Sequence, residues 1–146
     1  RRPSARPARP HVMRLHETQV ELEVPFHDVD MLGVVWHGNY FKYLEAARTP
    51  LLVACGLDAG DLIGPRYRFV VIESRCRHAF PLRYRDRMRV SAWVRGVAHQ
   101  VTIAYEITNL NAGRRSARAH TLLATLDAND KLLLETPHEI CSRLGL

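Results

Sequence analysis

Hydrophobic and polar residues alternate from Glu17 onwards, before any helical pattern begins. Acidic and amide side chains occupy one side of this alternation, and the other side carries Thr18, Val20, Leu22, Val24 and Phe26. A repeat of two residues is typical of a strand with one buried face. The pattern therefore predicts a half-buried β-strand over residues 17–26.

The period changes at Tyr40, where apolar residues begin to recur at helical spacing. They are Tyr40, Tyr43, Leu44, Ala47 and Leu51. Asn39 is a good N-cap for a helix that starts at Tyr40, and Gly56 stands where a left-handed residue can end it. Because apolar residues surround most of this helix, we expect it to be buried on most sides.

Pro50 lies inside the predicted helix. It removes an amide donor and crowds the carbonyl of Ala46, which costs about 3 kcal/mol. The apolar pattern resumes at once in LLVACG, so we expect a kink rather than a break. A loop rich in Gly, Asp and Pro is expected over residues 56–65.

The remainder of the chain is rich in strand-forming residues. Alternating or β-rich segments cover residues 66–80, 87–97, 99–110 and 115–128, and a turn at Asn129-Asp130 leads to a further expected strand, KLLLETP. Charged side chains recur on one face of successive strands, which favours a sheet with one solvated face and one face packed on the helix. The predicted class is α+β: one strand, one central buried helix, then about four antiparallel strands.

Composition assigns most of the basic charge to the amino-terminal end. The 146 residues carry a formal charge of +6, but residues 1–12 hold four arginines and no acid, so only +2 belongs to residues 13–146. We expect a disordered Arg/Pro-rich tail over residues 1–12 and one folded domain over residues 13–146. A nucleic-acid surface is not expected, because basic residues would have to be spread over the fold itself.

Two further features bear on location. No stretch approaches the roughly 18 apolar residues of a membrane span. Cys55, Cys76 and Cys141 are odd in number and widely scattered, which gives neither a disulfide framework nor a zinc-binding spacing. We therefore expect a cytoplasmic protein without a metal site.

The segment DVDMLGVVWHGNY, residues 28–40, holds the candidate chemistry. Asp30 precedes a buried helix by ten residues, and the free amides of a helix N-terminus can bind an oxyanion. A carboxylate beside an oxyanion site supplies two of the parts needed to hydrolyse an activated acyl group. The structural alternative is that Asp30 only closes an Asx-turn.

Other residues of this region have structural interpretations. Asp28 is predicted to be a solvated acid at the end of a strand. Glu45 and Arg48 are three residues apart on the helix, a spacing that favours an ion pair. Cys55 has no histidine nearby in the sequence, which argues against a cysteine nucleophile.

The stretch FHDVDMLGVVWHGNYFKYLEAARTPLL, residues 26–52, resembles the hotdog-fold acyl-CoA thioesterases of the 4-hydroxybenzoyl-CoA thioesterase type. The resemblance implies a single hotdog domain in which about five antiparallel strands wrap one long helix. It implies no cofactor and an active site at the interface of a homodimer, with dimers pairing into a tetramer. Pro50 departs from the residue more common in the family.

The resemblance also implies roles for individual residues. Asp30 corresponds to the catalytic carboxylate, which attacks the thioester or activates water, and the backbone amide of His37 corresponds to the group that polarises the thioester carbonyl. The expected substrate-binding positions around them are Gly33, Val34, Trp36, Gly38, Asn39 and Tyr40. The two glycines would permit close backbone approach, and the apolar residues would form the wall of the slot.

Two functions from different classes follow. The first is hydrolysis of an acyl thioester, carried by coenzyme A or an acyl-carrier protein, to a free acid and a thiol. The second is a non-hydrolytic hotdog protein that binds an acyl thioester or an acyl-carrier protein in a biosynthetic pathway. A dehydratase is a weaker third choice, because the histidine-plus-acid motif usual for hotdog dehydratases is not evident.

Overall fold

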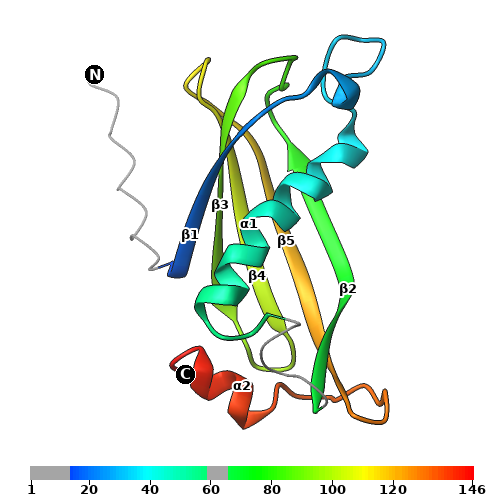
Figure 1. The fold of residues 1–146 in the computed structure, drawn as a ribbon, viewed down its shortest axis with the longest axis vertical. Coiled ribbons are helices and arrows are strands. Elements are labelled where there is room, and N and C mark those ends of the chain that lie inside the picture. Colours follow the sequence, from blue (N-terminus) through cyan, green and yellow to red (C-terminus); the bar gives the residue numbers. More distant parts are fainter. Residues whose placement is uncertain (1–13, 59–65) are drawn as a thin grey trace, which may run out of the picture.

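The computed structural model describes residues 14–58 and 66–146, and its core is one antiparallel sheet wrapped around a helix (Figure 1). The sheet has five strands in the order β1-β3-β4-β5-β2. The five strands and the main helix are, in chain order, β1 (Leu15–Glu23), α1 (Tyr40–Ala54), β2 (Tyr67–His78), β3 (Arg87–Gly96), β4 (Val101–Asn109) and β5 (Arg114–Asp127). The predicted α+β class and the order of strand, helix and four strands are confirmed.

Strand β1 has the half-buried character that its alternation predicts. Val20 and Leu22 are partly buried, whereas Glu21 and Glu23, which alternate with them, are exposed. The strand ends at Glu23, three residues earlier than predicted, because Pro25 leads into the short 3-10 helix η1 (Phe26–Asp28). Phe26 is therefore 75% exposed and does not continue the buried face.

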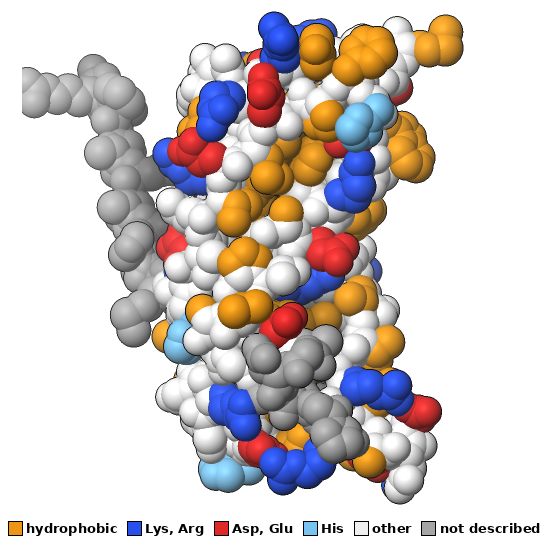
Figure 2. All heavy atoms as spheres, viewed as in Figure 1, with side chains coloured by type: hydrophobic (Ala, Val, Ile, Leu, Met, Phe, Trp, Pro, Cys, Tyr) orange, Lys and Arg blue, Asp and Glu red, His pale blue; other side chains and the backbone are white. Residues whose placement is uncertain are grey.

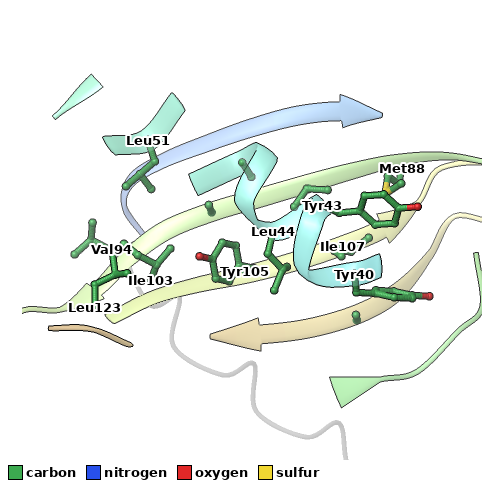
Figure 3. Packing of buried hydrophobic residues seen from close by; sticks show 14 of the residues in the cluster. Tyr40, Tyr43, Leu44, Leu51, Met88, Val94, Ile103, Tyr105, Ile107 and Leu123 are labelled. Atoms are coloured by element: carbon green, nitrogen blue, oxygen red, sulfur yellow. The ribbon is translucent and has the colours of Figure 1, made fainter. Parts of the chain in front are cut away.

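Helix α1 lies across the concave face of the sheet and buries one stripe of side chains. The stripe consists of Tyr40, Tyr43, Leu44, Ala47 and Leu51, most of which are drawn in Figure 3. The opposite side of the helix is exposed at Phe41, Glu45 and Val53. The expectation that this helix is buried on most sides is therefore wrong for the single chain.

The ends of α1 differ in how well the sequence predicts them. The helix begins at Tyr40 as expected, and it continues through Pro50 to Ala54 without a break. Gly56 has the predicted left-handed conformation, with a φ of +68°. Asn39, however, has helical backbone angles and its side chain makes no capping bond, because its amide group donates to the Asp28 carbonyl at 3.0 Å instead.

The inward faces of the central strands complete the core. Alternate residues of β3 and β4 pack beneath α1, as Figure 3 shows for several of them. They are Met88, Val90, Ala92, Val94, Ile103, Tyr105 and Ile107. Strand alternation therefore places the apolar side chains against the helix and leaves the other sheet face to polar residues.

The carboxyl-terminal segment differs from the prediction. KLLLETP forms no strand and contributes only a single bridge, between Leu126 and Leu132. A short helix that the sequence did not predict, α2 (His138–Arg143), follows it and buries Ile140 in the core. The guanidinium of Arg143 donates to the Gly56 carbonyl at 3.0 Å, so α2 is held beside the end of α1.

Two expectations concern segments outside the described residues, and a third concerns membrane spans. The predicted tail, residues 1–12, and most of the predicted loop at 56–65 lie outside the described residues. In the described part of the chain, no helix is long and apolar enough to cross a membrane.

Leu44→Ala tests the contribution of the α1 stripe. Leu44 is 1% exposed, so the truncation should leave a cavity and lower the free energy of unfolding by about 2–5 kcal/mol. Leu134→Ala is the matched control: that side chain is 85% exposed, and its truncation should change stability by no more than about 0.5 kcal/mol. Urea denaturation of both variants measures the difference, and equal losses would contradict this packing.

Candidate active site

The segment between β1 and α1 folds back on itself and presents Asp30 at its turn. Val29 and Val35 pair in an isolated antiparallel β-bridge, and the Asp30 amide donates to the Val34 carbonyl at 2.9 Å. Gly33 closes the turn with a φ of +80°, a conformation that other residues rarely adopt. The turn therefore explains why a glycine stands at position 33.

Asp30 is half-buried, and one of its carboxylate oxygens is engaged locally. Its Oδ1 accepts the Leu32 amide at 2.8 Å, which is an Asx-turn. The same residue lines a cavity of about 390 Å³. The structural and chemical interpretations of Asp30 are therefore compatible: one oxygen fixes the carboxylate, and the residue also borders the cavity.

The cavity lies between this segment and the chain that follows β2. Four of the sequence-predicted site residues line it: Asp30, Val34, His37 and Tyr40. Six residues that were not predicted line it as well: Leu32, Val35, His78, Ala79, Phe80 and Pro81. Long-range strand pairing brings the end of β2 to this place, so no local pattern in the sequence could have identified His78 or Phe80.

The remaining predicted positions do not line the cavity. Trp36 is 51% exposed, and its indole lies over Gly38 so closely that a Cβ on Gly38 would collide with the ring. A larger residue at position 38 would have to displace the Trp36 ring. Asn39 contributes through its hydrogen bond to the Asp28 carbonyl.

The start of α1 supplies free backbone donors next to the carboxylate. A short 3-10 helix, η2 (His37–Asn39), leads directly into α1. Within the described residues, the backbone amides of His37 and Gly38 have no hydrogen-bond acceptor. Unpaired amides at the start of a helix are suited to an anion or to a developing oxyanion, and His37 lines the same cavity as Asp30.

Asp28 is not the solvated acid that the sequence predicts. It is 3% exposed, and its carboxylate accepts bonds from Lys42 Nζ at 2.5 Å and from the Tyr43 hydroxyl at 2.6 Å. Burial alone would raise the pKa of Asp28, but these two hydrogen bonds and the charge of Lys42 outweigh it and hold the pKa below its usual range. The same contact, together with burial, raises the pKa of Tyr43.

His78 lines the cavity and has an ionisable side chain, although the sequence did not indicate it as a site residue. Its ring stands edge-on to Tyr40 with 4.4 Å between the centroids. Burial and the nearby charge of His37 lower the pKa of His78, which favours a neutral imidazole. Burial raises the pKa of Tyr40, so its phenol stays protonated.

Three further expectations concern residues outside the cavity. In the described part of the chain Glu45 and Arg48 form no ion pair, because the Arg48 guanidinium donates to the Tyr105 hydroxyl at 3.1 Å. Burial raises the pKa of Cys55, which disfavours a thiolate there. Over residues 14–58 and 66–146, no group of three His, Cys, Asp or Glu side chains could hold a metal ion.

Known proteins resemble the chain in both sequence and fold. The family described as "Thioesterase-like superfamily" matches residues 24–144. A Bacillus subtilis protein named "Putative acyl-CoA thioesterase YneP" is 28% identical over 106 residues, which covers 72% of this chain and 76% of that protein.

Solved structures also resemble this chain in fold. Slr0204, a 1,4-dihydroxy-2-naphthoyl-CoA thioesterase from Synechocystis, superposes with a TM-score of 0.76 at 19% identity, over 88% of this chain and 96% of that chain. A 4-hydroxybenzoyl CoA thioesterase complexed with 4-hydroxybenzoyl CoA gives a TM-score of 0.76 at 15% identity, over 88% and 99%. At these identities the two likenesses speak for the fold alone, and they confirm the hotdog domain expected from the sequence.

Tyr43→Phe tests the buried carboxylate. Removing the hydroxyl that donates to Asp28 should lower the free energy of unfolding by about 1.5–3 kcal/mol at neutral pH. A carboxyl whose folded-state pKa is lowered stabilises the fold above its unfolded pKa, and that stability is lost as the pH falls through the folded value. The difference between variant and wild type should therefore shrink on acidification.

Urea denaturation over a pH series measures this difference. Tyr84→Phe is the matched control, because Tyr84 is 49% exposed and its hydroxyl is not bonded to Asp28. A Tyr43→Phe loss that is the same at every pH would contradict the assignment to the ionised Asp28.

Proposed function

The chain belongs to the thioesterase-like superfamily, and on that premise we propose that it hydrolyses an acyl thioester through Asp30. The observation that carries the proposal is the position of this carboxylate, which borders a cavity that His37 at the start of the helical segment borders as well. The thioester would be that of coenzyme A or of an acyl-carrier protein, since both present the same bond.

The reaction follows from two groups that share the cavity. The Leu32 amide holds Asp30 Oδ1, so the other oxygen is the one able to attack the thioester carbon or to take a proton from water. The carbonyl oxygen gains negative charge as the new bond forms, and the amides of His37 and Gly38 are suited to stabilise it. Expulsion of the thiolate then leaves the acyl group on Asp30 for hydrolysis, or releases the acid directly.

The other cavity residues suit an acyl group. Leu32, Val34 and Phe80 offer apolar surface, whereas Tyr40 and His78 add a protonated phenol and an imidazole. We infer that the acyl chain occupies the apolar part of this cavity. The aromatic wall is compatible with both aromatic and aliphatic acids, so the acyl class stays open.

The non-hydrolytic alternative is the weaker one. The Asx-turn needs one side-chain oxygen, which an asparagine would also supply, so a protein that only holds a thioester has no need of a carboxylate at position 30. Asp30 therefore favours hydrolysis, and the alternative would become the better description if bound acyl-CoA released no free thiol.

We also propose a homodimer that forms through the free edge of β2. Within residues 14–58 and 66–146 this strand pairs with β5 alone, and Val70, Val71 and Ile72 on it are exposed at 37%, 46% and 50%. Hydrophobic side chains also gather along the face that carries α1 (Figure 2). A partner on this edge would cover unpaired strand and apolar surface at once, and pairing of dimers into a tetramer remains a prediction.

Asp30→Asn tests the catalytic assignment. The amide keeps the size of the side chain and an oxygen for the Leu32 bond, but it cannot act as a nucleophile or a base. We expect kcat for acyl-CoA hydrolysis to fall at least about a hundredfold with the fold retained. Asp58→Asn, outside the cavity, should leave kcat within about twofold. Thiol release from a panel of acyl-CoA substrates measures both, and near wild-type turnover by Asp30→Asn would refute the assignment.

Ile72→Lys tests the β2 edge. A lysine in a covered interface would have to lose its hydration, so the dimer dissociation constant should rise at least about a hundredfold. Leu134→Lys, at a side chain that is 85% exposed, supplies the matched control and should leave the dimer intact. Light scattering across a dilution series reports the oligomeric state, and an unchanged Ile72→Lys dimer would exclude this edge.

A further inference from the structure

A second and larger hollow lies on the opposite face of the sheet. Its volume is about 720 Å³, and arginines dominate its lining: Arg75 and Arg77 from β2, Arg118 from β5 and Arg95 from β3, with His120 among them. Residues next to these arginines along the strands point inward, since Cys76 and Ala119 pack against the core and Val94 is buried in it. The arginines therefore face away from α1 and from the cavity that holds Asp30.

The arrangement of charge in this arginine groove is unusual for a sheet face. Arg77 and Arg118 are direct cross-strand partners, and like charges in that position repel each other. Within the described residues, neither of them forms an ion pair, and neither does Arg95. The register of β2 with β5 thus places Arg77 and Arg118 opposite each other, and within the described residues neither has a counter-charge.

The nearby acids do not neutralise the groove. Glu73 contacts Arg75 at 3.1 Å and His120 at 3.5 Å. Glu106 lies opposite Arg118 on β4, yet its carboxylate turns to Arg14 at 3.4 Å. One carboxylate therefore contacts the arginines of the groove, which leaves a local excess of positive charge.

The residues between the arginines add no negative charge. Cys76 and Ala119 lie between the arginines along β2 and β5 and border the hollow, but their side chains pack toward the core. Burial raises the pKa of Cys76 to about 11, so its thiol stays uncharged at neutral pH. A hollow lined by four arginines, with no acid among its lining residues, is suited to an anion.

Spacing indicates the size of that anion. Arg75 and Arg77 are two residues apart on one strand, which separates them by about 7 Å, and Arg77 and Arg118 lie about 5 Å apart across strands. The forked donors of arginine match phosphate oxygens, and this spread exceeds what one phosphate group can contact. A volume of about 720 Å³ also has room for a nucleotide-sized molecule.

We propose that the arginine groove binds a small molecule that carries two or more phosphate groups, such as a nucleoside diphosphate or the nucleotide end of coenzyme A. This site lies on the other face of the sheet from the cavity of Asp30, and binding of pyrophosphate to it does not require thioester hydrolysis. The arginine-rich residues 1–12 have the same sign of charge and are unsuited to occupy it. A second copy that placed its own groove here would face the same repulsion.

Titration calorimetry with inorganic pyrophosphate tests the site on the full chain. Wild type should bind one pyrophosphate per groove, and Arg77→Gln with Arg118→Gln should weaken binding about tenfold or more. The matched control removes equal charge elsewhere, by Arg66→Gln with Arg87→Gln, whose guanidinium groups pair with Glu139 and Glu21. The control should bind within about twofold of wild type.

The groove variant also has a readout of folding. Because the substitutions relieve repulsion between two like charges, its Tm without ligand should equal or exceed that of wild type. Pyrophosphate should raise the Tm of wild type and of the control, and not that of the groove variant. The single variant Arg95→Gln should weaken pyrophosphate binding by a smaller factor than the double variant does. It tests the groove if the double variant fails to fold.

Competition identifies the source of the phosphates. Displacement of pyrophosphate by ADP assigns the groove to a separate nucleotide ligand, and displacement by coenzyme A alone assigns it to the substrate's own nucleotide end. The proposal is overturned if wild type binds no pyrophosphate, if both double variants bind it as well as wild type, or if neither ADP nor coenzyme A displaces it. A change of oligomeric state in the groove variant would likewise overturn it, since that face would then be an interface.

Discussion

The site depends on one buried carboxylate. Asp28 accepts bonds from Lys42 and Tyr43 in the first turn of α1, and its backbone carbonyl accepts the Trp36 amide and the Asn39 side chain. One residue thus connects the end of β1, the turn that carries Asp30 and the start of the helix. Removing any donor would leave part of a buried charge unpaired, which is why the segment has a defined geometry.

The two faces of the sheet carry different chemistry because strand alternation separates neighbouring residues. On β2, His78 contributes to the cavity near α1, whereas Arg77 contributes to the groove on the outer face. On β5, Ala117 and Ala119 pack inward and Arg118 points outward. A shift of one residue in the pairing of β2 with β5 would exchange these roles, so the register of that edge determines both sites.

Much of the fold could be predicted from the sequence because its signals are local. The two-residue period of β1, the helical spacing from Tyr40 and the glycine at position 56 each identify an element without knowledge of the rest. What failed depended on contacts distant in the sequence. KLLLETP has the composition of a strand but makes only the Leu126–Leu132 bridge with the end of β5, and α2 buries Ile140 in the core.

Prediction of the cavity residues was also limited by contacts between residues that are distant in the sequence. Asp30, Val34, His37 and Tyr40 were identified from one contiguous segment, whereas His78 and Phe80 reach the cavity through the pairing of β2 at the sheet edge. Asn39 and Gly38 were expected to cap the helix and to make room for a ligand. Asn39 instead bonds the Asp28 carbonyl, and Gly38 lies beneath the Trp36 indole; no local pattern in the sequence predicts either contact.

Asp28 and Asp30 are two residues apart, yet their surroundings leave only one of them available for chemistry. Asp28 is saturated: an ammonium and a phenol occupy its carboxylate, and a lowered pKa makes it a weaker base. Asp30 has one oxygen held by the Leu32 amide and lines a cavity large enough for an acyl group. A pair of carboxylates in unlike environments takes unlike roles. The acid with more contacts positions the helix, and the acid with fewer contacts is the one for which we propose a role in hydrolysis.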